Sequence, residues 1–161
     1  MEALGNGATD GLKLAANVGA MLVAFISIVA LVNYLLSFAG TSMDAILAIV
    51  FKPLAWTMGV PWEEAGQMGM LMGKKIVFTE LIAYGDLKDI IAEGQISERT
   101  AIIASYALCG FANFGSIGIQ LGGIGGMAPE RKKDLAKLVT KAMVGGALAS
   151  WLTATVAGIL I

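Results

Sequence analysis

Two long uncharged stretches dominate the pattern of polar and apolar positions. Residues 14–43 and 142–161 contain no Asp, Glu, Lys or Arg. A helix needs about 20 mainly apolar residues to cross a bilayer. The pattern therefore predicts a membrane-spanning helix over residues 11–38 and a terminal transmembrane helix over 129–161. Pro129 can be the first residue of the latter, because the backbone N–H that proline lacks would have no partner within the first turn.

The segment between residues 42 and 60 is amphipathic rather than uniformly apolar. Asp44, Lys52 and Pro53 interrupt its apolar positions, and Trp56 and Trp62 flank its end. Tryptophan favours the level of the lipid headgroups. These features predict a helix that lies in the membrane interface.

Residues 62–95 carry charges throughout, yet two short apolar stretches, 68–72 and 76–84, lie among them. Apolar segments too short to span are typical of re-entrant structure. Non-helical backbone is tolerated at membrane depth where protein or water surrounds it. We therefore expect a re-entrant hairpin of two helices that meet near residues 78–80.

Residues 98–127 are predicted to form a broken helix. The uncharged stretch 100–129 starts with a clean helical pattern, and glycines and polar residues then interrupt it. This pattern predicts an unwound centre near residues 110–116 and a frayed end at 122–127. The fold class is therefore expected to be all-α integral membrane, with long transmembrane helices, a re-entrant hairpin and an unwound helix.

The distribution of basic residues predicts the orientation in a cell membrane that the chain crosses several times. The strongest cluster consists of Arg131, Lys132, Lys133, Lys137 and Lys141. Lys and Arg are enriched in cytoplasmic loops. We expect the loop 128–141 to be cytoplasmic, where it can also touch anionic lipid, and the C-terminus to lie outside.

Composition supports the membrane class and narrows the chemistry. Hydrophobic residues make up 57% of the chain and charged residues 14%, against roughly 25% charged in soluble domains. The net charge of −1 argues against a nucleic-acid partner. With no histidine and one cysteine, a His-dependent hydrolase, an intrachain disulfide and a cysteine-based metal site are excluded. No organic cofactor and no metal ligand set are expected.

The first candidate site is Thr79 and Glu80 at the expected hairpin tip. A carboxylate within the membrane costs at least about 2.5–3.5 kcal/mol and marks a functional site by default. Such a group can accept hydrogen bonds from sugar hydroxyls or help to bind a cation. The alternative interpretation is a structural ion pair between Glu80 and Lys74 or Lys75.

The second candidate site is the expected break in the helix over 98–127. Asn113 offers two donors and an acceptor, and Ser116 offers a hydroxyl. Phe111 or Phe114 offers an apolar face for a ring. Unwound backbone can face a ligand, as in transporters with discontinuous helices; the alternative is a simple kink with Asn113 satisfied by neighbouring backbone.

The chain resembles the C-terminal domain of concentrative nucleoside transporters along nearly all its length. The matching stretches, in order, are residues 7–8 with Gly11, 14–22, 24–25, 53–55, 59–62, Glu80 with 83–84, 107–114 (Ala-Leu-Cys-Gly-Phe-Ala-Asn-Phe), 116–119, 122–123 and 128–131. Their order and spacing together make the match specific.

The resemblance implies a homotrimeric symporter that moves nucleosides inward with sodium or protons and is not an enzyme. The family's second hairpin carries an acidic residue that binds the ribose, which matches Glu80. The aromatic, amide and hydroxyl of its second broken helix match Phe111, Asn113 and Ser116. Thr79 stands where the family commonly has asparagine, so any contact of that amide is in doubt here.

The resemblance also implies that something is missing. The family's first hairpin, with a Gly-Gln-Thr-Glu-like tip, contacts the base and helps to form the cation site, and no such segment occurs in residues 1–161. We therefore expect the chain to be the C-terminal half of a nucleoside transporter, inactive without an N-terminal half that holds most of the Na+ or H+ site. The other hypotheses are a membrane scaffold without transport and a membrane-embedded enzyme that uses Glu80.

Overall fold

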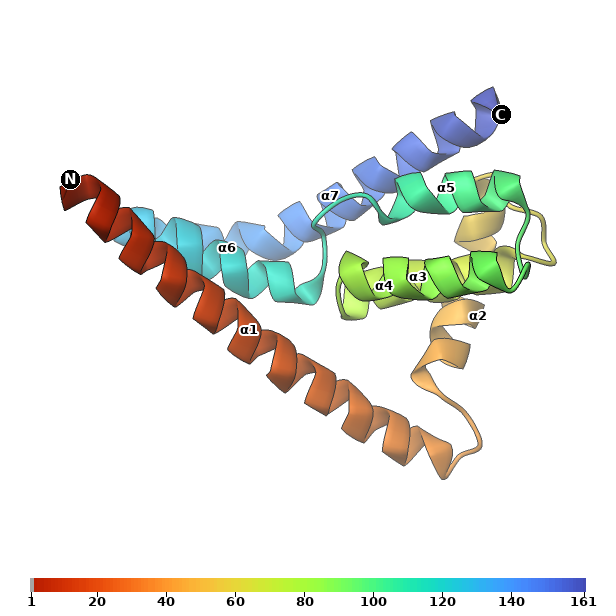
Figure 1. The fold of residues 1–161 in the computed structure, drawn as a ribbon, viewed down its shortest axis with the longest axis horizontal. Coiled ribbons are helices and arrows are strands. Elements are labelled where there is room, and N and C mark those ends of the chain that lie inside the picture. Colours follow the sequence, from red (N-terminus) through yellow and green to blue (C-terminus); the bar gives the residue numbers. More distant parts are fainter. Residues whose placement is uncertain (1) are drawn as a thin grey trace.

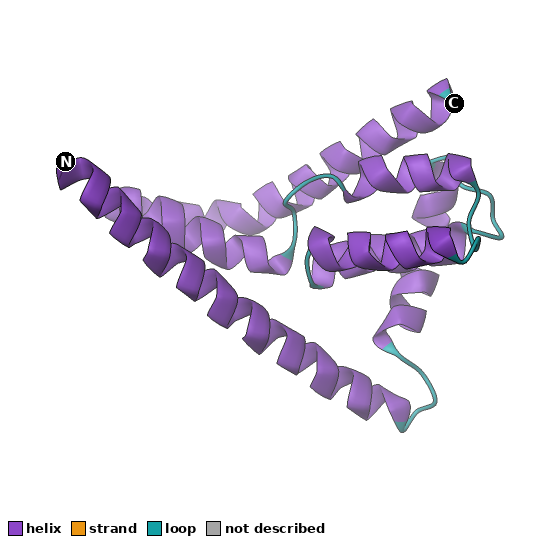
Figure 2. Ribbon diagram, in the orientation of Figure 1, coloured by secondary structure: helices purple, strands orange, loops and turns teal. Residues whose placement is uncertain are grey.

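The computed structural model describes residues 2–161; the side chains of residues 2, 18, 21, 22, 25, 126 and 127 lie outside the described set. The elements are α1 (Glu2–Ser37), α2 (Met43–Thr57), α3 (Ala65–Val77), α4 (Glu80–Ala92), α5 (Glu98–Leu108), α6 (Phe114–Met127), the 3-10 turn η1 (Pro129–Arg131) and α7 (Lys132–Leu160) (Figure 2). No strand occurs within residues 2–161. The expected all-helical class is confirmed.

The helices form a body at one end, and α6 and the first part of α7 extend away from it alongside α1 (Figure 1). Helices α2, α3, α4, α5 and the C-terminal part of α7 lie together at one end of the molecule (Figure 1). Helix α1 runs diagonally past them and contacts α6 and the start of α2. Helix α1 begins at Glu2 rather than at residue 11. In its polar first turns the Thr9 hydroxyl donates to the Gly5 carbonyl.

The core of the body combines alanines and methionines with larger aliphatic residues. Its buried members on the two hairpin helices include Met68, Leu71, Met72, Ala83 and Leu87. Small side chains let helix backbones approach closely in membrane proteins. Methionine fills the irregular gaps that such close approaches leave.

Helix α6 differs from the expected unwound and frayed segment. It begins at Phe114, so Ser116 lies in its first turn, and it continues through the glycines of 122–126 to Met127. Two contacts explain this: a capping box at Asn113 starts the helix, and Gly125 lies against the methylenes of Lys132, where a Cβ would be 3.1 Å away. Tertiary packing on α1 and α7 therefore overrides the weak helix propensity of glycine.

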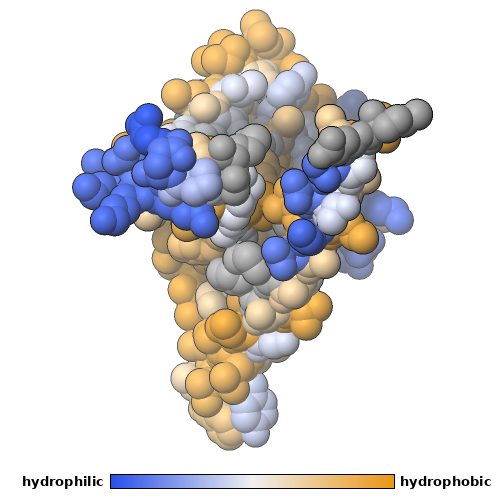
Figure 3. Space-filling view, turned by 90° about the vertical axis from the view of Figure 1, so that its left-hand side faces the viewer, coloured by the Kyte–Doolittle hydropathy of each residue, from blue (hydrophilic) through white to orange (hydrophobic). Residues whose placement is uncertain are grey.

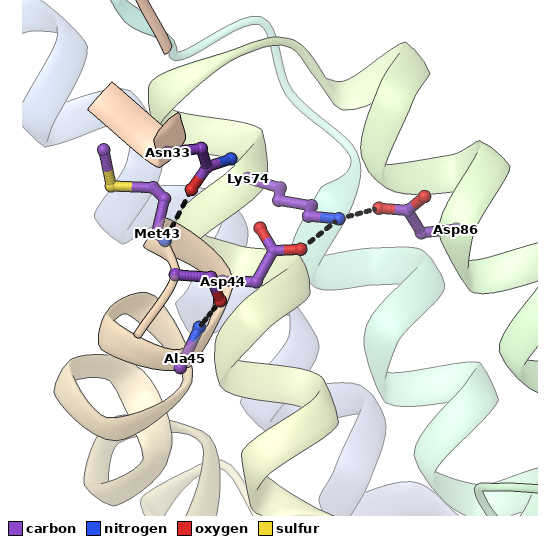
Figure 4. Close-up of polar contacts among 7 residues, drawn as sticks. Asn33, Met43, Asp44, Ala45, Lys74 and Asp86 are labelled. Carbon is purple, nitrogen blue, oxygen red and sulfur yellow. Dashed lines mark hydrogen bonds and ion pairs between the residues drawn. The ribbon is translucent and has the colours of Figure 1, made fainter. Parts of the chain in front are cut away.

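Three charged side chains join α2, α3 and α4 (Figure 4). The Lys74 ammonium lies 3.0 Å from an Asp44 carboxylate oxygen and 2.7 Å from one of Asp86. Beside them the Asn33 side-chain oxygen of α1 accepts a hydrogen bond from the Met43 backbone N–H at 2.7 Å. These contacts fix the start of α2 against the hairpin near its tip.

The Lys74 cluster should contribute modestly to stability. The Asp44 side chain is 40% exposed, and such partly exposed ion pairs contribute about 0–1 kcal/mol. Asp44→Asn is therefore expected to lower the melting temperature of the purified protein by at most about 4 °C. Asp89→Asn, an exposed carboxylate on α4, is the matched control and should leave it unchanged. A loss well above about 4 °C would mean that the cluster holds the hairpin more firmly than its exposure allows.

Apolar surface covers much of the molecule. By length and composition, Pro129–Leu160 is the one helix in the described residues that could cross a membrane, and Ile26–Ser37 is a shorter apolar helix. Large side chains such as Leu138, Leu152 and Ile159 are exposed on α7. On the face shown in Figure 3, hydrophilic residues gather in two groups and hydrophobic residues cover most of the rest. Exposed apolar surface of this extent is typical of contact with lipid or with other protein.

Candidate functional site

The tip of the helical hairpin presents a carboxylate at a helix N-terminus. Helix α3 ends at Val77, Phe78 and Thr79 make the link, and Glu80 is the first residue of α4. The Thr79 hydroxyl does not cap α4. The partial positive charge at a helix N-terminus favours a carboxylate there.

The interruption between α5 and α6 spans residues 109–113. Hydrogen bonds between Asn113 and Ser116 stabilise the end that leads into α6. Asn113 is the N-cap of α6, and its side-chain oxygen accepts from the Ser116 N–H at 2.7 Å. The Ser116 hydroxyl donates to the Asn113 carbonyl at 2.6 Å and accepts from the Asn113 N–H at 3.3 Å. Both side chains are fully buried. The pair therefore fixes the first turn of α6 and the direction of the Asn113 amide.

The hairpin tip and the helix interruption meet. The Asn113 side-chain amide donates to a Glu80 carboxylate oxygen at 3.0 Å. The structure thus brings together two residues that are 33 positions apart in the sequence. A simple kink, in which neighbouring backbone satisfies Asn113, explains the bond that its side-chain oxygen accepts from a backbone N–H. It does not explain the side-chain NH2 group, which donates to Glu80.

The alternative of an ion pair at Glu80 is wrong for the described residues. Lys74 pairs with Asp44 and Asp86. Lys75 donates to the Ala107 carbonyl and to the Ser150 hydroxyl. Asn113, not a lysine, is thus the partner of Glu80.

The aromatic side chains of the interruption are accessible. Phe111 is 53% exposed and Phe114 is 42% exposed. The chain enters this loop through Gly110, whose φ of 136° favours glycine. Phe111, two residues before Asn113, therefore has an exposed ring face. Thr79, at the hairpin tip, is half-buried.

Two residues of the hairpin also bind the last turn of α5, a contact that the sequence did not predict for either of them. The Tyr84 hydroxyl donates to the Ser105 carbonyl at 2.7 Å, and the Lys75 ammonium donates to the Ala107 carbonyl at 2.8 Å. The last carbonyls of a helix lack partners within the helix. A signal was present in the sequence, since Lys75 is a charge directly before the apolar stretch that leads to the tip.

Comparisons with known proteins identify the family of the chain. The sequence profile described as "Na+ dependent nucleoside transporter C-terminus" matches residues 1–158. The chain is 46% identical to the transporter YutK of Bacillus subtilis, over 100% of this chain and 41% of that protein. It is 40% identical to the nucleoside permease NupC of Helicobacter pylori, again over 100% of this chain and 41% of that protein. The chain therefore spans about two fifths of the length of these curated relatives.

The fold agrees as well. A solved structure of CNTnw in an inward-facing substrate-bound state superposes with a TM-score of 0.83 and 43% identity, over 96% of this chain and 38% of that one. The family resemblance seen in the sequence is thus confirmed by sequence profile, by relatives and by fold. Because the profile covers nearly the whole sequence, the chain belongs to the Na+ dependent nucleoside transporter C-terminus family, and it is a membrane protein of a transporter family.

Proposed function

We propose that this chain supplies the ribose-side half of the substrate site in a nucleoside:cation symporter. The hydrogen bond between Glu80 and Asn113 carries the proposal. It brings together the N-termini of α4 and α6, which carry a carboxylate and an amide respectively. The orientation of the amide is fixed by the cap of α6. Such a pair can accept from and donate to adjacent sugar hydroxyls.

Each site residue has a distinct role in the proposal. Glu80 accepts hydrogen bonds from ribose hydroxyls, and Asn113 bonds the same sugar. Ser116 assists by holding the Asn113 amide, since its hydroxyl is engaged in the cap. Phe111 packs on the ligand with its exposed face. Thr79 offers a hydroxyl beside Glu80 that makes no cap bond.

The proposed membrane placement follows the helices. Residues 62–95 form the re-entrant hairpin, 98–127 the broken helix, 11–38 the scaffold helix and 129–161 the terminal span, with the loop 128–141 cytoplasmic and the C-terminus outside. Residues 42–60 lie in the interface. Trp56 and Trp62 support this last assignment, because both are exposed and Lys52 lies 4.4 Å from the Trp62 ring.

The complete transporter in this proposal pairs the chain with an N-terminal half. That half supplies the base-side contacts and most of the site for the coupling ion, Na+ or H+, so this chain alone does not transport. The assembly is a homotrimer in lipid. The family profile supports sodium dependence, and the relatives' greater length supports a second half.

Uptake of labelled uridine into proteoliposomes tests the proposed function. With the complete transporter and an inward Na+ or H+ gradient, uridine should accumulate above its external concentration, and ionophores that collapse the gradient should abolish accumulation. The chain alone should give no uptake above protein-free liposomes. Product formation without accumulation would favour an enzyme, and the absence of both would favour a scaffold.

A further inference from the structure

Lys75 is a buried cation that the proposed substrate contacts leave without a role. Its side chain is fully buried. No carboxylate in the described part of the chain lies within ion-pair distance of its ammonium. A buried charge is costly unless polar groups compensate it. The groups that surround Lys75 therefore indicate what it does.

Those groups come from the interrupted helix and from α7. The ammonium donates to the Ala107 carbonyl at 2.8 Å and to the Ser150 hydroxyl at 2.6 Å. Ser150 in turn donates to the Ala147 carbonyl at 2.9 Å, which leaves its oxygen free to accept. Gly110 is also near, since a Cβ there would be 3.6 Å from the Lys75 nitrogen. Lys75 thus lies where α5 ends and the interruption begins.

The end of α5 is a place that attracts cations. The last carbonyls of a helix carry partial negative charge. In transporters with discontinuous helices, half-helix C-terminal ends and unwound carbonyls coordinate the coupling ion. Here the ammonium of Lys75 donates hydrogen bonds to a carbonyl and a hydroxyl at such a helix end. The Lys75 ammonium therefore lies at a position where the end of a helix favours positive charge.

We propose that Lys75 is a resident cation at the helix break, and that it positions the loop that carries Phe111 and Asn113 for the substrate. This inference rests on the proposed function. It assigns Lys75 as a positioning residue, because it acts through the Ala107 carbonyl and the loop that follows, while Glu80 and Asn113 touch the sugar. It also implies that the end of α5 needs no metal ion.

Chemical rescue tests the proposal in the complete transporter. Lys75→Ala removes the ammonium and leaves space for a small amine. Leaving the buried carbonyl and hydroxyl unpaired should weaken uridine binding about tenfold or more. Ethylammonium at constant ionic strength and constant Na+ should restore part of that affinity, and choline should not, because it is too large for the space.

Thermal unfolding provides a second measurement that needs no nucleoside. A ligand that binds only the folded protein raises its melting temperature. Ethylammonium should therefore raise the melting temperature of Lys75→Ala by a few degrees and leave that of the wild type unchanged. Lys74→Ala is the matched control, because Lys74 is the neighbouring lysine and binds Asp44 and Asp86 instead. It should show neither rescue nor a tenfold loss of uridine affinity.

The outcomes separate the two proposals. Wild-type uridine affinity in Lys75→Ala, or a loss that ethylammonium leaves unchanged in both measurements, would overturn the role of Lys75. If the wild type binds no nucleoside, the proposed function fails, and the melting experiment still decides whether the cation site exists. If Lys75→Ala does not fold, Ser150→Ala replaces it: a roughly twofold to tenfold loss of uridine affinity supports the proposal, and wild-type affinity contradicts it.

Discussion

Glu80→Gln is expected to weaken uridine binding to the complete transporter by about tenfold or more. The change keeps the size of the side chain and removes its charge, so hydrogen bonds from the ribose to a carboxylate become bonds to a neutral amide. A lost or unpaired buried partner costs roughly 1–3 kcal/mol, more for a charged group, and each 1.4 kcal/mol or so is tenfold in affinity. Equilibrium binding of labelled uridine measures the loss.

A second ligand shows whether Glu80 contacts the sugar directly. A site built to bond a hydroxyl discriminates strongly against an analogue that lacks it. Glu80→Gln should therefore cost less affinity for a deoxyuridine that lacks the contacted hydroxyl, and the 2′- and 3′-deoxy compounds identify which hydroxyl that is. If uridine and both analogues lose affinity equally, Glu80 does not contact either hydroxyl. Glu63→Gln is the control and should change none of the affinities, because Glu63 is an exposed carboxylate that precedes the start of α3.

The sequence predicted the structure best where the physical cost of a residue in the membrane leaves few interpretations. Uncharged stretches and a midchain carboxylate predicted helices and a hairpin tip, and the structure has helices α3 and α4 with Glu80 at their junction. The cost of placing a carboxylate in the membrane identifies Glu80 as a candidate functional residue from the sequence alone. Its partner could not be predicted with the same certainty, because Lys74 and Lys75 are near it in sequence, whereas Asn113 is near it only in space.

The glycine-rich segment 122–127 is where the structure differs from the expectation drawn from the sequence. Composition alone predicted that residues 122–127 fray, because glycine is a poor helix former. The structure has helix there, since α6 packs on α1 and α7 and its start is capped by Asn113. The burial of Lys75 was equally unpredictable, because it depends on Ser150, which is 75 residues away along the chain.

Glycines also determine how closely α2 and α3 approach. Ala65, Gly69 and Gly73 recur at four-residue spacing on α3, the pattern that lets membrane helices pack backbone to backbone. A Cβ at Gly69 would be 2.8 Å from the Ala48 carbonyl oxygen and 2.9 Å from the Lys52 nitrogen. Backbone atoms cannot rotate away as a side chain can, so any added group must push the two helices apart.

Gly69→Ala should therefore destabilise the protein, although alanine is the better helix former. Overpacking typically costs about 1–3 kcal/mol, which corresponds to a fall in melting temperature of roughly 2–12 °C for a protein of this size. Gly66→Ala on the same helix is the matched control, because a Cβ at Gly66 would have no atom within 4 Å; it should keep or slightly raise the melting temperature. Thermal unfolding of the purified variants in detergent measures both. Equal stability of the two variants would show that α2 and α3 are not in backbone contact at Gly69.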